Sequence, residues 1–434
     1  MRTNMSRRDV LRLSSIGGIG GLLTLGDQIS EPLAEQLKRQ QAGKTSGIKI
    51  TDVEQFQVEI PFPKEELIKG QINSFDVLRI KTTEGITGYA FDLFNRGLKF
   101  DWLVSSTKYE KYNFQERLDK VRSIIIGQDP FAIEQFLERF AVIGFETYGI
   151  VECALWDIVG KATGMPVHKL LGGNKKKTKY YITMVWPNED TISPAAQAED
   201  ILGYDRQGYH AIKVRAFRKN GMDDVELAKL VMAKASPGFR LMFDRCGPFS
   251  GQTWTYEQAY QVAKGMQDVG VYWLEEPFEV GDMTKAARLN QAMNMLITGG
   301  DLCVDVSIFA ELLSNNVFDS VEPDCYLVGG ILNVKKIGAM AQAFNKQCIP
   351  HGTPPTIRMF GHLQANAALT NCEYQEVGIL FPPCPPNEFL YQKPGLKLLN
   401  TSYMFEMDKE YITIPQGAGL GMDINEDALE EYKV

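Results

Sequence analysis

Seven apolar runs decide the fold of this chain: AIKVRAF (211–217), RLMFDRC (240–246), VYWLEEPF (271–278), LITGGD (296–301), VEPDCYL (321–327), CIPHG (348–352) and EYQEVG (373–378). Each run is rich enough in β-branched and aromatic residues to form a buried strand, and the intervals between runs carry mostly helical periodicity. This alternation predicts a parallel sheet. When such a sheet closes into a barrel, the carboxyl ends of all strands lie at one mouth, so charged residues at those ends converge.

Length and composition favour an acidic soluble enzyme. The chain has 434 residues, which suits a barrel of about 250 residues with an added domain. Hydrophobic residues make up 44% of the chain, enough for a full core. The net charge of −8 argues against nucleic acid or an anionic membrane surface as a partner.

The N-terminal segment, residues 1–46, is predicted to be an export signal followed by a linker. SRRDVLR (6–12) precedes LSSIGGIGGLLTLG (13–26), which is too short and too glycine-rich to span a bilayer stably. Paired arginines before a weakly apolar run resemble a twin-arginine signal, which predicts a periplasmic or exported protein. The alternative is a disordered basic tail on a cytoplasmic protein. Residues 27–46 are polar, as is typical of a linker.

The seven cysteines do not predict disulfides. Their number is odd, and none shows CxxC or zinc-like spacing. Most are therefore expected to be small core residues. Export of an already folded protein would reconcile free thiols with an oxidising destination.

A separate α+β domain is predicted before the barrel. ITDVEQFQVEI (50–60) and SFDVLRIKTTEGITGYAF (74–91) alternate apolar with polar residues, and Thr-Glu-Gly at 83–85 signals a turn within the second stretch. This pattern predicts an antiparallel meander. Helical segments follow at about 113–139 and 148–164.

The predicted domain boundaries follow from these changes of pattern. The α+β domain is assigned to residues 47–175 and the β/α barrel to residues 176–395. Residues 396–434 come after the last strand-like run and are expected to pack back on the α+β domain.

Three carboxylates at the ends of successive runs predict a metal site: Asp244, Glu275 and Asp301. Acids that converge on one mouth repel unless a cation neutralises them, and a set of oxygen ligands suits Mg²⁺ or Mn²⁺. Surface or ion-paired acids are the alternative. Glu276 is expected to point the other way by strand alternation, and to support the ligands rather than be one.

The candidate base is His351, because of the four histidines it alone ends a run at the same mouth. Asp324 ends the preceding run, so the two side chains could lie side by side. A carboxylate on one imidazole nitrogen fixes the tautomer and leaves the other nitrogen to accept a proton. A plain structural histidine is the alternative. His168 and His210 are expected to be structural, and His362 to be an outer neighbour at most.

Lys213 and Arg215 lie two residues apart in one run, so they share a face of the strand. Arginine is not deprotonated at working pH, and Arg215 is therefore expected to bind a substrate anion or hydroxyl groups rather than to abstract a proton. Solvated charges at the rim of the barrel are the alternative for both residues.

From about residue 48 onward, the chain resembles the enolase superfamily, in its mandelate racemase/muconate lactonizing enzyme branch. ALWDIVGKATGMPVHKLLGG (154–173) resembles the phrase that closes the capping domain of that family. The acidic and histidine motifs fall where the family places its metal ligands and its His-Asp pair: Asp244, EEP (275–277), GGD (299–301), EPD with Asp324, and PHG with His351. The resemblance implies a modified (β/α)7β barrel with an α+β capping domain.

The resemblance also implies a reaction that begins with removal of a proton α to a carboxylate, with a Mg²⁺ ion stabilising the resulting enediolate. Lys213 is then expected to contact the substrate carboxylate, and Glu376 to hydrogen-bond the enediolate. The family often has a second lysine where this chain has Arg215. A racemase needs bases on both faces, whereas elimination of a β-hydroxyl needs one. A sugar-acid dehydratase, which gives a 2-keto-3-deoxy acid, is therefore the predicted function.

Cys246 leaves alternatives open. Some dehydratases of the family have a histidine as general acid at this position near the substrate, and a buried thiol is a poor substitute. Either His351 serves both steps, or the enzyme is a cycloisomerase or an epimerase using the same chemistry. A non-catalytic exported sugar-acid binding protein is a further alternative. The loop at 61–76 is expected to set specificity, and a homo-oligomer is expected from the family.

Overall fold

The computed structural model describes residues 47–61, 63, 73–92, 114–140, 149–186, 188, 190–246, 253–279, 281–352, 354–379 and 392–434. The predicted signal and linker, and most of the predicted specificity loop, lie outside the described residues. Lys49–Val434 form one compact unit. None of the helices in the described ranges has the length and apolar character needed to cross a membrane.

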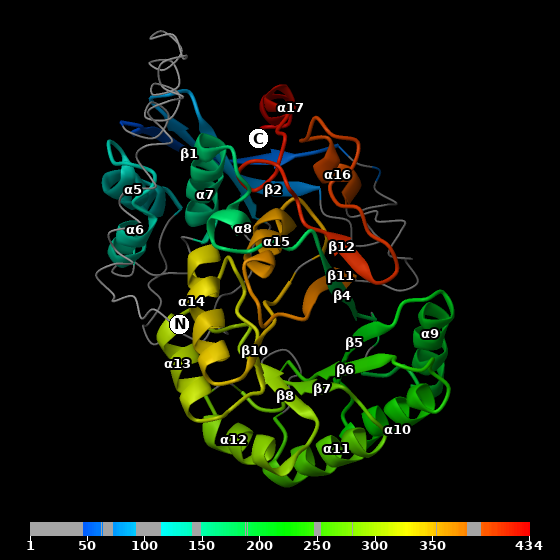
Figure 1. The fold of residues 1–434 in the computed structure, drawn as a ribbon. Coiled ribbons are helices and arrows are strands. Elements are labelled where there is room, and N and C mark those ends of the chain that lie inside the picture. The colour runs from blue at the N-terminus through cyan, green and yellow to red at the C-terminus, as the bar shows by residue number, and fades with distance from the viewer. Residues whose placement is uncertain are drawn as a thin grey trace, which may run out of the picture. The chain divides into compact units, whose positions relative to one another are not determined.

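The larger sheet contains eight parallel strands that alternate with helices (Figure 1). The strands are β4 (Lys177–Met184), β5 (Ala211–Arg215), β6 (Arg240–Asp244), β7 (Trp273–Glu275), β8 (Leu296–Gly299), β9 (Ser320–Val321), β10 (Gln347–Cys348) and β11 (Tyr374–Ile379). The intervening helices are α9 (Pro194–Arg206), α10 (Gly221–Met232), α11 (Tyr256–Asp268), α12 (Met283–Ala292), α13 (Val306–Ser314), α14 (Ile331–Ala343) and α15 (Met359–Ala367).

This arrangement confirms the predicted fold class. Each of the seven runs contains or overlaps one strand, and β4 adds an eighth before them. The strand order is β10-β9-β8-β7-β6-β5-β4-β11. The strands at the two ends of this order are β10 and β11. The N–H of Cys348, on β10, donates a hydrogen bond to the carbonyl of Asn371, just before β11 (3.0 Å). The six cysteines among the described residues are free and buried, as expected for core residues.

The register of the sheet brings the charged strand ends to one level. Arg215 is the ladder partner of Asp244, and Asp244 is the partner of Glu275. Partners in a parallel ladder lie side by side on the same face of the sheet. Beneath this level, the Tyr181 and Trp273 rings meet edge to face, with their centroids 5.1 Å apart inside the barrel. The barrel is therefore filled below the charged residues rather than open.

The smaller sheet is the predicted antiparallel meander, which is also confirmed. It contains β1 (Ile50–Glu59), β2 (Ser74–Thr82) and β3 (Thr87–Asp92) in that order. Gly85, in the turn between β2 and β3, has a φ of 72°, which favours glycine. The helices of this capping domain are α5 (Phe114–Ile125), α6 (Ile133–Phe140), α7 (Gly149–Thr163) and α8 (Val167–Leu170).

Buried hydrogen bonds join the capping domain to the barrel. The carboxylate of Glu152, on α7, accepts hydrogen bonds from the N–H groups of Ile331 and Leu332 at the start of α14, each at 2.8 Å. Residue 330 must be glycine, because a Cβ atom there would lie 2.2 Å from Glu152 Oε2. Burial raises the pKa of Glu152 to about 7, although these N–H groups oppose the shift. The capping helix thus holds the segment that follows β9.

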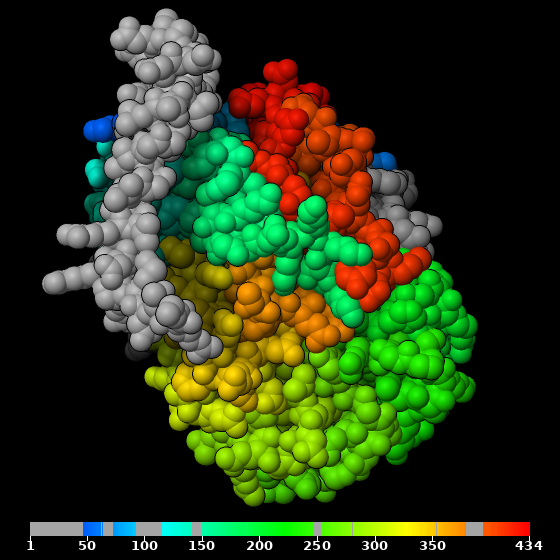
Figure 2. Space-filling view, viewed as in Figure 1, coloured from blue at the N-terminus to red at the C-terminus, as the bar shows by residue number. Residues whose placement is uncertain are grey.

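The C-terminal segment contacts both domains. It contains α16 (Gln392–Leu396), β12 (Tyr411–Thr413) and α17 (Glu426–Glu431). β12 pairs antiparallel with β4, and Glu430 forms an ion pair with Arg79 of the capping sheet (2.7 Å). Figure 2 shows this segment, coloured orange to red, beside the teal surface that includes α7 and α8.

Candidate active site

The structure brings Lys213 together with several predicted acidic residues. Its ammonium lies 3.0 and 2.8 Å from the two carboxylate oxygens of Glu275, 2.9 Å from Glu376 Oε1 and 3.8 Å from Asp244 Oδ2. Burial alone would lower the pKa of Lys213, but Glu275 and Glu376 raise it well above its usual value. The side chain is only 1% exposed. Lys213 is therefore held as a cation among these acids, and a protonated ammonium has no lone pair for proton abstraction.

Arg215 lies two residues after Lys213, at the carboxyl end of β5 and therefore closer to the mouth. Its Nη1 pairs with Asp244 Oδ2, and 22% of its side chain is exposed. Because part of this side chain reaches solvent, a substrate anion could approach it. The substrate-binding role stays a prediction.

The three predicted metal ligands, Asp244, Glu275 and Asp301, are all buried acidic side chains. Oδ1 of Asp244 and Oδ1 of Asp301 are buried and have no hydrogen-bond partner among the described residues. Burial raises the pKa of Asp244, and repulsion from Asp301 adds to this, against the opposing effects of Arg215 and Lys213. Burial, and then repulsion from Asp244, raises the pKa of Glu275 to about 7.

The same residues fit a divalent cation, because their donors are all oxygens and two buried oxygens have no partner. In the described ranges, no group of three or more His, Cys, Asp or Glu side chains is already arranged around a common point as a metal centre would be. Both oxygens of Glu275 are instead hydrogen-bonded to Lys213. Asp244, Glu275 and Asp301 are the residues that would hold an ion.

The expectation that Glu276 points away from the site is wrong. β7 ends at Glu275, and Glu276 has a φ of 44°, so strand alternation does not apply to it. Its Oε1 accepts a hydrogen bond from the Gly300 N–H (3.3 Å). Burial, and then the charge and hydrogen bond of Asp301, raises the pKa of Glu276 well above its usual value. A protonated Glu276 could donate a hydrogen bond to Asp301. Its expected role in supporting the ligands stays a prediction.

Cys246 has the same unusual backbone conformation, with a φ of 44° two residues after Asp244. Burial, and then the Asp244 carboxylate, raises the pKa of its thiol well above the usual value. The thiol therefore stays protonated and is a weak acid, in agreement with the sequence argument.

His351 and Asp324 form a hydrogen-bonded pair, with His351 Nδ1 2.9 Å from Asp324 Oδ2. The His351 side chain is 23% exposed, whereas Asp324 is fully buried. Burial would raise the pKa of Asp324, but Arg358 and His351 hold it well below its usual range. Burial would lower the pKa of His351, but Glu376, the Asp324 hydrogen bond and Asp301 raise it to about 9. A cation bound by Asp301 would oppose that rise, because it cancels the Asp301 charge.

Glu376, on β11, faces both Lys213 and His351. Its Oε2 lies 3.9 Å from His351 Nε2 and accepts a hydrogen bond from the Gly352 N–H at 2.8 Å, while Oε1 accepts one from the Thr183 hydroxyl. Burial would raise the pKa of Glu376, but Lys213, His351 and these donors lower it to about 2. An ionised carboxylate only accepts hydrogen bonds. The expected hydrogen bond from Glu376 to an enediolate would require its protonated form, and this role stays a prediction.

The other three histidines lie away from this constellation or beneath it. His168 is buried and its Nδ1 pairs with Gln364 Oε1 (2.8 Å), while His210 is part-exposed and lies 3.3 Å from Asp205. His362 is buried, and neither of its ring nitrogens has a hydrogen-bond partner in the described part of the chain. Burial lowers its pKa to about 3, so it is neutral. These placements agree with the structural roles expected of them.

Three residues at the site were not singled out from the sequence: Thr183, Glu322 and Arg358. Glu322 follows β9 directly and is buried; burial, and then the charge of Glu275, raises its pKa well above the usual value. Its position at a strand end is the same signal that selected Asp244, so it could have been found. Thr183 also lies near the end of a strand, β4, but that strand was not among the seven runs, whereas Arg358 precedes a helix and carries no such signal.

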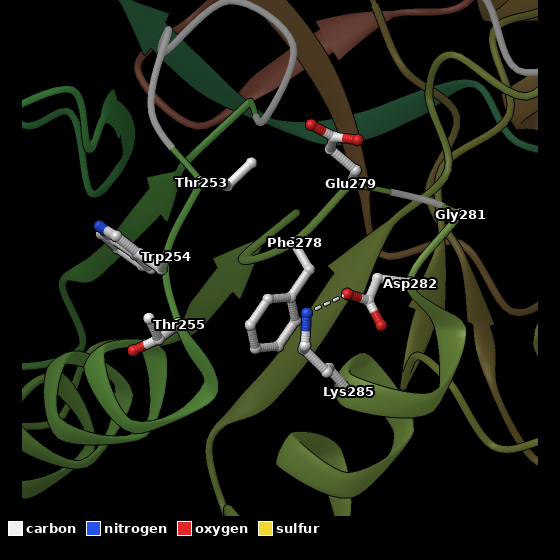
Figure 3. A pocket seen from close by; sticks show the side chains of 8 residues that line it. All are labelled: Thr253, Trp254, Thr255, Phe278, Glu279, Gly281, Asp282 and Lys285. Carbon is white, nitrogen blue, oxygen red and sulfur yellow. Dashed lines mark hydrogen bonds and ion pairs between the residues drawn. The ribbon is translucent and has the colours of Figure 1, made fainter.

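A separate hollow of about 460 Å³ lies beyond β6 and β7, between the N-terminal ends of α11 and α12. Its lining residues are Thr253, Trp254, Thr255, Phe278, Glu279, Gly281, Asp282 and Lys285 (Figure 3). None of them is a predicted site residue. Two have structural tasks, because Thr255 caps α11 and Lys285 pairs with Asp282. The chemistry is therefore assigned to the barrel mouth.

Comparisons with known proteins agree with this fold. The mandelate racemase/muconate lactonizing enzyme N-terminal domain family matches residues 65–172, and the enolase C-terminal domain-like family matches residues 194–428. Arabinonate dehydratase of Saccharolobus solfataricus is 29% identical over 329 residues, which cover 74% of this chain and 83% of that protein. D-galactarolactone cycloisomerase of Agrobacterium fabrum is 25% identical over 320 residues, which cover 71% of this chain and 82% of that protein.

Among solved structures, a racemase from Streptomyces coelicolor A3(2) with bound magnesium has a similar fold. The TM-score is 0.66 at 20% sequence identity, and the match covers 89% of this chain and 100% of that one. Because the enolase-like family alone spans more than half of the chain, and the N-terminal family matches the capping domain before it, this chain belongs to the enolase superfamily, in the mandelate racemase/muconate lactonizing enzyme group.

Proposed function

We propose that this protein is a Mg²⁺-dependent sugar-acid dehydratase, which removes the α-proton of a sugar acid and eliminates the β-hydroxyl to give a 2-keto-3-deoxy acid. The observation that carries the proposal is the pairing of the charged side chains among the described residues of the mouth. His351 is paired with Asp324, whereas Lys213 and Arg215, the basic side chains of β5, are held as cations in ion pairs. One-sided elimination suits this arrangement and racemisation does not.

In the proposed reaction, Nε2 of the neutral form of His351 accepts the α-proton, and a cation held by Asp301 would favour this form because it opposes the rise in the pKa of His351. Asp324 accepts the hydrogen bond from Nδ1–H and stabilises the imidazolium that forms. The same imidazolium returns the proton to the departing β-hydroxyl, which leaves as water, and the resulting enol tautomerises to the 2-keto acid. Arg215 binds the substrate anion or its hydroxyl groups. Mg²⁺, when bound by Asp244, Glu275 and Asp301, supplies Lewis-acid stabilisation of the charge that develops on the substrate carboxylate.

Membership of the superfamily supports an enzyme, and the similarity to an arabinonate dehydratase supports the elimination. A cycloisomerase is the second candidate. It is favoured by Cys246, whose protonated and buried thiol is a poor general acid, and by the similarity to a D-galactarolactone cycloisomerase. Both reactions begin with the same proton abstraction.

The test is a screen of the full chain, with Mg²⁺, against hexonic, pentonic, deoxy- and aldaric acids, with 2-keto-3-deoxy product scored by semicarbazide absorbance. The control variants are His351→Asn and His210→Asn. His210 is a part-exposed histidine outside the site, and its loss is expected to leave activity unchanged. A hit that is lost only in His351→Asn would support the proposal. A hit that survives in His351→Asn would refute the assigned base.

If the screen gives no product, exchange of the substrate α-proton with solvent deuterium distinguishes the alternatives. An enzyme that enolises anhydro-sugar acids or lactones incorporates deuterium, and the dehydratase proposal would then give way to cycloisomerisation. A binding protein incorporates none with any ligand that it retains.

A further inference from the structure

Arg358 links the candidate His-Asp pair to the capping domain. It directly precedes α15 and is fully buried. Its Nη2 lies 3.0 Å from Asp324 Oδ1, and its Nε lies 3.1 Å from Asp92 Oδ1. Asp92 is the last residue of β3 in the capping sheet. One guanidinium therefore bridges two carboxylates that belong to different domains.

The surroundings of Arg358 fix its orientation. Its guanidinium carbon lies 4.3 Å from the centroid of the Tyr326 ring, and the Tyr326 hydroxyl donates a hydrogen bond to the Arg358 carbonyl (3.1 Å). The Tyr326 N–H in turn donates to Asp324 Oδ1 (2.8 Å). A buried cation needs well-placed partners to offset its desolvation, and here the stacking ring and two carboxylates supply them.

The two carboxylate oxygens of Asp324 have different partners. Oδ1 accepts from Arg358 and from the N–H groups of Tyr326 and Leu327, at 3.0, 2.8 and 3.1 Å. Oδ2 faces Nδ1 of His351 at 2.9 Å, with Arg358 Nη1 at 3.5 Å. With Oδ1 held on three donors, rotation of the carboxylate is restricted and Oδ2 stays directed at the imidazole.

We propose that Arg358 is a positioning residue, which fixes the Asp324 carboxylate against His351 and ties this pair to capping strand β3 through Asp92. The proposal rests on the proposed use of His351 as the base, but it does not depend on which sugar acid is the substrate. It follows that His351 is correctly oriented only when the end of β3 is in place beside the barrel. Lysine would be an incomplete substitute, because a single ammonium lacks the planar fork that spans both carboxylates.

The test uses the full chain labelled with ¹⁵N at histidine, in metal-free buffer and with Mg²⁺. There are only four histidines, and His351→Asn assigns the His351 signals. The charged groups that act on His351 are Asp324, Glu376 and Asp301, with Arg358 and His362 next to Asp324. At a pH above about 9, where His351 is neutral in the metal-free native protein, it is expected to carry its proton on Nδ1, with a slowly exchanging Nδ1–H signal.

Arg358→Met is expected to abolish the slow Nδ1–H signal and to populate the other tautomer, and Arg358→Lys to restore it in part. Asp92→Asn should weaken it in the same direction. Once the screen has identified a substrate, kcat for that substrate should fall about 10- to 100-fold in Arg358→Met, with little change in KM. The matched control is Arg218→Met, which removes another buried guanidinium, paired with Asp224. That variant is expected to lose stability without changing the His351 signals.

Unchanged His351 signals in a folded Arg358→Met protein would overturn the positioning role. A changed Arg358→Met spectrum with an unaffected Asp92→Asn spectrum would overturn the link to the capping strand. If Arg358→Met does not fold, Arg358→Lys and Asp92→Asn decide the matter by the same signals. Failure of the dehydratase screen with the expected spectra would count against the proposed function and not against this role of Arg358.

Discussion

Lys213→Met is the most informative single change, because Lys213 balances the acids at the barrel mouth. Its ammonium lies within 3.0 Å of both oxygens of Glu275 and of Glu376 Oε1, and 3.8 Å from Asp244. Removing one partner of a buried ion pair costs about 3–5 kcal/mol, since the remaining charges stay buried without compensation. The free energy of unfolding in metal-free buffer at pH 7 is expected to fall by that amount.

The measurement is urea unfolding of the native protein, Lys213→Met and Lys264→Met. Lys264 is an exposed lysine paired with Asp268 on α11, and its replacement should cost less than about 1 kcal/mol. The Lys213→Met deficit should shrink as the pH falls from 7 toward 4.5, because burial and repulsion raise the pKa of Glu275 and its protonation then relieves the excess charge. Mg²⁺ should also stabilise this variant more than the native protein.

Equal stability of Lys213→Met and Lys264→Met at pH 7 would refute this reasoning. It would mean that the acids around Lys213 are balanced by protons rather than by its ammonium. A deficit that grows as the pH falls would have the wrong sign and would exclude carboxylate repulsion as its cause.

Three further predictions concern pH, metal and export. The pKa of Glu376 is lowered to about 2, so its ionised form stabilises the folded protein by on the order of 3 kcal/mol above pH 4.5. This contribution is lost as the pH falls toward 2, and the acid unfolding of Glu376→Gln should lack it. Mg²⁺ at 100 times its dissociation constant should stabilise the native protein by about 2.7 kcal/mol, and Asp301→Asn should gain much less in the same thermal scans. Replacing Arg7 and Arg8 together by lysine should retain the protein in the cytoplasm of its host, and unchanged export in cell fractionation would exclude a twin-arginine signal.

The sequence predicted the barrel because its decisive signal is local. Short β-branched runs separated by helical intervals define a parallel sheet, and each of the seven runs corresponds to a strand. Strand-end positions then placed Asp244, Glu275 and His351 at one mouth. The ladder partners Asp244 and Glu275 show why this inference works, since parallel strands in register bring their carboxyl ends to one level.

The strand pattern could not predict two local features of the site, the orientation of Glu276 and the contact made by Arg358. Glu276 lies next to the acids although alternation predicts the opposite, because its left-handed backbone conformation turns it back toward Asp301. A backbone reversal at a non-glycine residue has no reliable signal in a single sequence. The contact of Arg358 with Asp324 was equally invisible, because Arg358 precedes a helix and shows no strand-end position.

The sequence by itself determined which residue types arrive at the mouth, since strand periodicity and chain order decide that. Only the tertiary structure decided their charge states and partners. Lys213 is enclosed by Glu275 and Glu376, and the positive charges of Lys213 and His351 lower the pKa of Glu376 against the effect of burial. Burial and the distances between charges on different strands set these properties, and both exist only once the chain has folded.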